Sequence, residues 1–178
     1  LLAKIKEAGK KFICDSCYAC KGFYMFSNVK ASLQGKADLI TKSLHQDNGQ
    51  TFIDEMCKQI RAKYFDKHGN KKKLKKTNTD LFRVHDSGDL FSPKYITAWF
   101  KICEQFPTIK FWFPTREWKR DSQLPHLQKL ASLKNVCIKP SAIYVYESAP
   151  QVDGFDAVTS VYTSKEQAEQ DVHFVCPA

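Results

Sequence analysis

Short apolar runs alternate with helical patterns along most of the chain, and this alternation limits the fold more than any other feature. The runs cover residues 81–84, 109–113, 136–138, 157–161 and 172–175. Their near-continuous apolar character is typical of strands that are covered on both faces. Strands that alternate with helices pair in parallel through right-handed crossovers. The sequence therefore predicts an α/β fold with a mainly parallel sheet, and we expect Phe12 and Ile13 to end a further strand.

Five segments between and before these runs carry helical patterns. Apolar residues recur at helical spacing from residue 51 to 65, and Ser92 followed by Pro93 is typical of the start of a helix. The predicted helices cover residues 24–43, 51–65, 93–106, 124–133 and 164–170. A chain of 178 residues is long enough to bury a sizeable core in one domain. We expect a single α/β domain over residues 1–178, trimmed at both ends, with residues 66–80 as a basic inserted loop.

Polar residues follow the predicted strands at the points where the strands end. They are residues 85–89 after the first strand, Thr115 and Arg116 after the second, Ser141 after the third and Cys176 after the last. The carboxyl ends of parallel strands converge on one edge, where α/β proteins bind their ligands. The alternative is that polar residues simply begin loops. On the first interpretation the catalytic candidates are His85, Asp86, Ser87, Asp89 and Arg116, and the cofactor-binding candidates are Gly88, Thr115 and Ser141.

The chemistry of these side chains supports a site, although each residue also has a simpler explanation. His85 suits acid–base or metal-ligand chemistry, and the aspartates after it can pair with an ammonium group. The glycine between those aspartates permits close approach of a ligand, and Arg116 offers a fork of donors to a carboxylate or phosphate. Alternatively, His85 bonds to loop backbone, Asp86 closes an Asx turn, and Arg116 forms a buried ion pair with Glu117.

Three of the seven cysteines lie within residues 14–20, in the sequence CDSCYAC. An odd number of cysteines with three in one loop is a poor disulfide framework and favours metal binding. Three thiolates at CxxCxxC spacing can hold three corners of a cubane, and a distant Cys-Pro completes such clusters in bacterial ferredoxins. The predicted ligands of an iron–sulfur cluster, with zinc or no metal as the alternatives, are Cys14, Cys17, Cys20 and Cys176. The remaining cysteines lie in apolar patterns and are expected in the core; they are Cys57, Cys103 and Cys137.

The chain is strongly basic, and much of its positive charge is local. Lysine and arginine outnumber aspartate and glutamate by 28 to 19, which gives a net charge of +9. One run holds many of the lysines: Lys71, Lys72, Lys73, Lys75 and Lys76. Such a run is either a solvated loop or a contact to the phosphates of nucleic acid. Trp112 and Trp118 could offer stacking surfaces to bases, although burial of Trp112 in the core is the alternative.

Nothing in the sequence directs the chain to a membrane. No apolar run approaches the roughly 20 residues that span a bilayer. No charged, apolar and small-residue pattern of a signal peptide opens the chain. We therefore expect a cytoplasmic protein.

Four motifs together resemble the phage gene product 88 family. They are Cys17-Tyr18-Ala19 with Gly22, residues 82–89 with Tyr95, residues 111–116, and Cys176-Pro177-Ala178. The resemblance implies an architecture similar to that of radical S-adenosylmethionine enzymes, which is a partial (β/α) barrel with a cysteine-rich loop at its open mouth. It further implies a 4Fe–4S cluster, S-adenosylmethionine as a candidate cofactor and, for a phage protein, a location in the host cytoplasm.

The cysteine spacing departs from that enzyme superfamily, because it is CxxCxxC here and CxxxCxxC there. If Cys176 is a ligand as well, all four irons of the cluster are occupied and none is left to hold a cofactor. Two functions therefore stay open. The first is radical modification of a substrate, and the second is a non-catalytic module, stabilised by a metal, that binds nucleic acid or a host protein.

Overall fold

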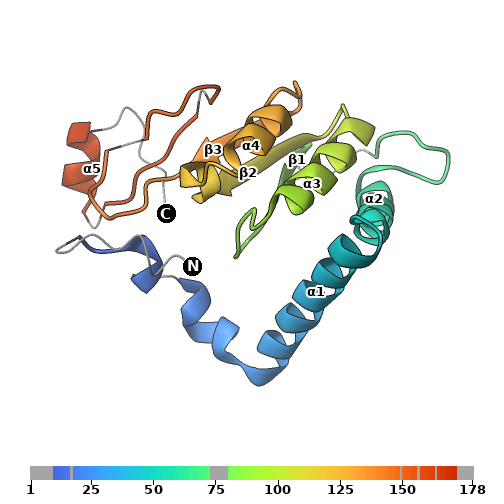
Figure 1. Cartoon of the computed structure of the whole chain (residues 1–178), viewed down its shortest axis with the longest axis horizontal. Helices are drawn as coiled ribbons and strands as arrows, with labels where there is room; N and C mark the ends of the chain where they lie inside the picture. Colours follow the sequence, from blue (N-terminus) through green and yellow to red (C-terminus); the bar gives the residue numbers. More distant parts are fainter. Residues whose placement is uncertain are drawn as a thin grey trace.

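Three strands and the helices packed on them form the centre of the molecule (Figure 1). The structure is a computed structural model, and it describes residues 10–16, 18–72, 80–148, 150–155, 157–162 and 164–171. Of four residues within these ranges it describes the backbone alone: Cys14, Ser16, Tyr18 and Asp171. The α-helices are α1 (Ser27–Gln46), α2 (Gln50–Tyr64), α3 (Pro93–Gln105), α4 (Leu124–Ala131) and α5 (Lys165–Asp171). Short 3-10 turns are η2 (Ile13–Ser16), η3 (Tyr18–Cys20), η4 (Gly22–Met25) and η5 (Glu117–Lys119). All five predicted helices are thus confirmed.

The sheet is parallel, as predicted from the first three apolar runs. Its strands are β1 (Leu81–Arg83), β2 (Lys110–Thr115) and β3 (Val136–Pro140), and they lie in this order. Phe82 pairs with Phe111, and Phe113 pairs with Ile138. α3 connects β1 to β2 and α4 connects β2 to β3, so each crossover is a helix. The prediction of an α/β fold is therefore confirmed.

The sheet is open, so the predicted partial barrel is wrong for the part of the chain that the structure describes. The run at residues 157–161 contributes a single parallel bridge, between Ser141 and Thr159. The run at residues 172–175 lies outside the described residues. At the other edge, the Tyr64 hydroxyl of α2 donates a hydrogen bond to Leu81 O at 2.9 Å. This bond occupies a carbonyl that a further strand beside β1 would need, so α2 ends the sheet there.

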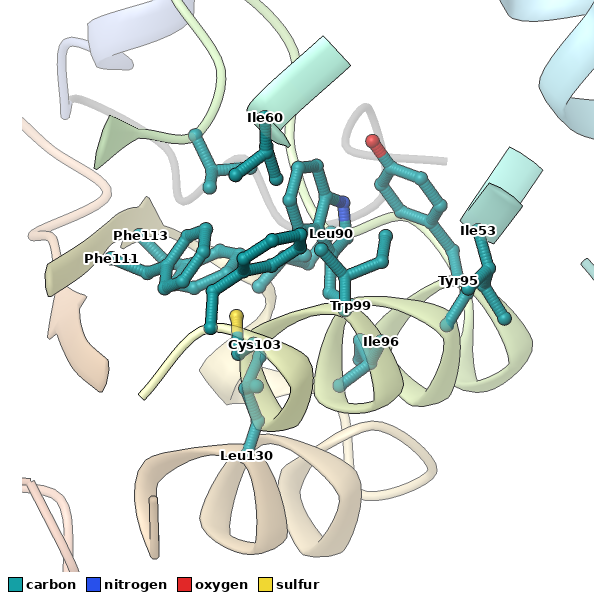
Figure 2. Packing of buried hydrophobic residues seen from close by; sticks show 14 of the residues in the cluster. Ile53, Ile60, Leu90, Tyr95, Ile96, Trp99, Cys103, Phe111, Phe113 and Leu130 are labelled. Atoms are coloured by element: carbon teal, nitrogen blue, oxygen red, sulfur yellow. The ribbon is translucent and has the colours of Figure 1, made fainter. Parts of the chain in front are cut away.

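α3 and α4 cover one face of the sheet and bury its core (Figure 2). Trp99 of α3 meets Phe113 of β2 edge to face, with 5.5 Å between ring centroids. Phe52 of α2 contacts the same tryptophan, with 5.7 Å between ring centroids. At the start of α3, Tyr95 N donates to Ser92 Oγ at 3.2 Å, which confirms the predicted N-cap. Isoleucine and leucine side chains of both helices are fully buried here, namely Ile96, Ile102, Leu127 and Leu130.

The opposite face of the sheet is exposed, which corrects the prediction that the strands are covered on both faces. Successive residues of a strand point to opposite faces. Phe111 and Phe113 are 1% and 0% exposed, whereas Trp112 between them is 36% exposed. Cys137, which pairs with Trp112, is also exposed and is not the core residue that its pattern predicts. The reason is that α3 and α4 pack beside each other on a single face.

Candidate functional site at the carboxyl edge of the sheet

Asp89 joins the loop after β1 to the end of β2. Its Oδ1 accepts hydrogen bonds from Leu90 N at 2.7 Å and from Thr115 Oγ1 at 2.5 Å. Its Oδ2 accepts a hydrogen bond from Arg116 N at 2.9 Å. The first two strand ends therefore meet, as the pattern of polar residues predicts. Because three protein donors occupy its carboxylate, Asp89 holds the edge together.

Arg116 and Ser141 join the ends of β2 and β3 in the same way. Arg116 Nε donates to Ala142 O at 3.1 Å, and Trp118 Nε1 donates to Ser141 O at 2.9 Å. Ser141 is buried, and its Oγ accepts a hydrogen bond from Thr159 Oγ1 at 2.9 Å. These side chains thus tie β2 to the segment that follows β3. Their predicted roles in binding a cofactor or substrate remain predictions.

His85 lies in the loop after β1 and points into the aromatic core. Its backbone has a positive φ of 65°, which is uncommon for a residue other than glycine. The ring lies 5.7 Å from Tyr95 and 6.5 Å from Trp99 between centroids, and its Nε2 is 2.9 Å from the Tyr95 hydroxyl. Nδ1 is buried and has no hydrogen-bond partner among the residues that the structure describes.

Burial changes the ionisation of both partners in this pair. Desolvation lowers the pKa of His85, with a smaller opposing effect of Asp89, so the imidazole is neutral at neutral pH. Desolvation also raises the pKa of Tyr95 to about 12. The neutral imidazole can therefore serve as a base, and its backbone strain is of the kind that occurs at functional sites. The acid–base role predicted for His85 remains a prediction.

Glu117 belongs to the same edge, and the sequence suggests it only as an alternative ion-pair partner of Arg116. The structure corrects that pairing, because Glu117 Oε2 lies 2.6 Å from Arg120 Nε. Burial raises the pKa of Glu117, and the nearby charge of Asp89 raises it further. The signal that could have revealed this residue is its place directly after a predicted strand end.

The cysteine turns lie across this edge because hydrogen bonds hold the chain on both sides of them. Before the turns, Phe12 forms an isolated antiparallel bridge with Tyr144, so the expectation that Phe12 and Ile13 end a further strand is wrong. Ile13 N donates to Ile143 O at 3.0 Å. After the turns, the Tyr24 hydroxyl donates a hydrogen bond to Asp86 Oδ2. The chain is therefore held to the segment after β3 just before η2, and to the loop after β1 just after η3.

The predicted metal ligands are described only in part. Cys14 lies in η2 with its backbone alone described, and Cys20 lies in η3 with an exposed side chain that is not in a disulfide. Cys17 and Cys176 lie outside the described residues. Within the described ranges, no three histidine, cysteine, aspartate or glutamate side chains form a group that could hold a metal ion. The ligand set therefore remains a prediction, and three thiols within seven residues form a donor set that suits iron or zinc.

Open space lies beside the cysteine turns and at the loop after β1. An open groove of about 610 Å³ is lined by Ala19 and Tyr24 and by residues of α1 that include Lys30 and Leu33. Gly88 has a φ of 99°, and no heavy atom lies within 4 Å of the position that a Cβ would take. The glycine thus permits a backbone turn that other residues rarely adopt, and it leaves that position open.

Two lysines of the basic run contact other groups of the protein. Lys71 Nζ lies 2.6 Å from Asp80 Oδ2, and Lys72 Nζ donates to Ala62 O at 2.7 Å at the end of α2. These two lysines are therefore engaged by protein groups. The other lysines of the run, which are Lys73, Lys75 and Lys76, lie outside the described residues.

The fold and this edge define a class: an α/β protein with an open three-stranded parallel sheet and a polar, cysteine-flanked carboxyl edge. The chain belongs to the Gene product 88 family, whose model matches residues 7–177. It is 34% identical to the Gene 88 protein of Mycobacterium phage D29 over 122 residues, which are 68% of this chain and 46% of that protein. It is 31% identical to the Gene 88 protein of Mycobacterium phage L5 over 105 residues, which are 59% of this chain and 40% of that protein.

The chain spans less than half the length of these two curated relatives. No solved structure matches it. Among the helices that the structure describes, none combines the length and apolar character needed to cross a bilayer. Family membership confirms the resemblance to gene product 88, and nothing in these comparisons points to radical S-adenosylmethionine enzymes.

Proposed function

We propose that this protein binds an iron–sulfur cluster through Cys14, Cys17 and Cys20, with Cys176 as a fourth ligand. The observation that carries the proposal is the position of the cysteine turns. Two hydrogen bonds, Ile13 with Ile143 and Tyr24 with Asp86, attach the chain before and after these turns to the carboxyl edge of the sheet. Ligands of α/β proteins bind at this edge.

The donor set favours a cluster over a zinc ion. A structural zinc site usually draws two ligands from each of two separated cysteine pairs. Here three thiols share one loop of seven residues, and this spacing occurs in cluster-binding ferredoxins. On both sides of Cys17 the chain forms tight 3-10 turns, η2 and η3, and such turns keep the backbone of the loop compact.

The number of cysteine ligands distinguishes a catalytic from a structural cluster. A 4Fe–4S cluster supplies single-electron chemistry when it is bound, and a cluster with three protein ligands keeps one iron open. Three ligands would therefore suit a catalytic protein with S-adenosylmethionine as cofactor. In that case His85 would act as a base, while Asp86, Ser87 and the open space at Gly88 would receive the cofactor or substrate.

A non-catalytic, metal-stabilised module is the second candidate function. It is favoured by the hydrogen bonds of Asp89 and Arg116, whose side chains hold strand ends together. It is also favoured if Cys176 closes the cluster with a fourth thiolate. In this case the protein would act by binding nucleic acid or a host protein. The lysine run would then contribute to the binding of nucleic acid.

Anaerobic purification followed by absorbance and metal analysis tests the proposal. We expect a band near roughly 400 nm together with iron and acid-labile sulfide. Cys17→Ser and Cys20→Ser should each remove most of the absorbance and iron, whereas Cys137→Ser should leave both unchanged. Cys137 is the matched control because it is exposed but lies on the sheet, outside the loop. Zinc in place of iron, or full iron content in Cys17→Ser, would overturn the proposal.

The fourth ligand and the catalytic role need a second measurement. If Cys176 is a ligand, Cys176→Ser should lower the iron content as strongly as Cys17→Ser does. Calorimetry of the reconstituted protein with S-adenosylmethionine then separates the two candidate functions. Binding that requires the cluster supports catalysis, and absence of binding with a four-cysteine cluster supports the structural role.

A further inference from the structure

The exposed face of the sheet carries a tryptophan surrounded by positive charges. We define the open face as the strand residues that point away from α3 and α4, namely Leu81, Arg83, Lys110, Trp112, Pro114, Cys137 and Lys139. Three of these seven side chains are cationic and none is a carboxylate. The open face is therefore electropositive, in a chain whose net charge is +9.

Trp112 is the centre of the open face. It lies on the middle strand and is 36% exposed. Arg83 of β1 places its Cζ 5.2 Å from the indole centroid, and Lys139 of β3 places its Nζ 5.9 Å from it. Cations at such distances are attracted to the face of an aromatic ring. Each neighbouring strand thus contributes a positive charge beside the same indole.

We propose that the open face binds single-stranded nucleic acid, with a base stacked on Trp112 and phosphates paired with Arg83, Lys110 and Lys139. Proteins that bind single strands combine an aromatic stacking surface with cations that follow the phosphate backbone. A stacked base displaces one long, flexible cationic side chain from the indole. That side chain then turns toward a phosphate, so the cation and the ring serve the same strand.

The chemistry of the open face argues against two other candidate partners, a second copy of the chain and a DNA duplex. Parallel sheets are normally covered on both faces, so a partner is expected here. A second copy of the chain, related by a twofold axis, would bring like charges against each other at this face. A DNA duplex hides the faces of its bases in the stack and so offers the indole nothing to stack on. A single strand offers both base faces and phosphates.

This inference is independent of the proposed cluster, because the open face and the cysteine loop share no residues. It also differs from the prediction based on the lysine run. Two lysines of that run are engaged by Asp80 and Ala62, as described above. The cations of the open face instead come from the strands themselves, and their alternation with buried residues fixes them on one surface.

Fluorescence anisotropy with a labelled thymidine oligonucleotide of about 12 nucleotides tests the inference on the full chain. We expect Trp112→Ala to weaken binding roughly 5- to 150-fold, because stacking on an aromatic side chain contributes that much per base. Trp112→Phe should recover most of the affinity, since it keeps an aromatic face. Thermal melts should show both variants folded, because Trp112 lies outside the buried core.

The charge contribution is tested by the salt dependence of the same binding. Neutralising Arg83, Lys110 and Lys139 together to glutamine should reduce the slope of log affinity against log salt by about 2. Lys101→Gln is the matched control, because Lys101 is an exposed lysine on α3, behind the covered face. Lys101→Gln should leave the slope of log affinity against log salt unchanged.

Three results would overturn the inference. The first is wild-type affinity in Trp112→Ala, and the second is duplex DNA of the same length binding as tightly as the single strand. The third is sedimentation that shows a dimer which Trp112→Ala dissociates, because a second copy would then occupy the open face.

Discussion

The two faces of the sheet differ sharply although they belong to the same three strands. On the covered face, Phe111 and Phe113 are 1% and 0% exposed and pack under Trp99. On the open face, Trp112 is exposed between two cations. The aromatic residues of β2 are therefore consecutive in sequence and opposite in role. Alternation along the strand buries one side in the core and leaves the other side exposed, where we propose that it binds nucleic acid.

The carboxyl edge of the sheet borders both faces, and it contains both bonded and exposed side chains. Asp89 and Arg116 hold the strand ends with their side chains, as the covered face holds the sheet. The exposed side chain of Asp86 accepts a hydrogen bond from Tyr24, and the position at Gly88 is open. The edge therefore has a rigid part toward β2 and β3 and an accessible part after β1. A site that binds a ligand needs both.

The largest expected effect separates the two faces by stability. Phe113→Ala should lower the free energy of unfolding by about 3–5 kcal/mol, because it removes a fully buried ring and leaves a cavity beneath Trp99. Trp112→Ala should lower it by only about 1–2 kcal/mol, because the indole is exposed and loses mainly its contacts with cations. Urea unfolding followed by circular dichroism measures both. Equal losses in the two variants would contradict the division of the sheet into covered and open faces.

A smaller effect separates the rigid part of the carboxyl edge from its accessible part. Asp89→Asn should lower the free energy of unfolding by about 1–3 kcal/mol. The three groups that donate to the carboxylate would lose a charged acceptor, and the new amide NH2 would face at least one of these donors. Asp86→Asn should cost less, because Asp86 is exposed. The same unfolding experiment compares them. If Asp86→Asn is the more destabilising change, the assignment of Asp89 as the residue that joins the strand ends is wrong.

The elements of this fold could be predicted because their signals are local. Helical patterns indicated all five helices, with the clearest apolar spacing in α2, and Ser92 with Pro93 indicated the start of α3. Polar residues after the apolar runs also indicated correctly that Asp89, Thr115 and Arg116 meet. Strand ends in a parallel sheet converge for geometric reasons, so this prediction required only the order of elements.

The number of strands and the exposure of each face could not be predicted in the same way. Whether a run such as residues 157–161 pairs along its whole length depends on contacts from distant segments, and here a bridge at Thr159 is its contribution. Similarly, the hydrogen bond from Tyr64 that closes the β1 edge joins residues 17 positions apart. The sequence pattern around Trp112 and Cys137 is equally compatible with a covered and an open face. The types of the side chains do not determine on which face of the sheet the helices pack.

The smallest expected effect is a difference in pH dependence at the carboxyl edge. Burial raises the folded-state pKa of Glu117 above its ordinary value of 4.5, so the folded protein holds this proton more tightly than the unfolded chain does. The contribution of Glu117 to stability is therefore largest at low pH and declines as the pH rises above 4.5 through the folded-state pKa. Glu117→Gln removes this decline. In urea unfolding at pH 4.5 and 7, the variant should gain stability relative to the wild type as the pH rises. A relative gain by the wild type would mean that the ion pair with Arg120 outweighs burial, and that the carboxylate is held at the edge as a stabilising charge.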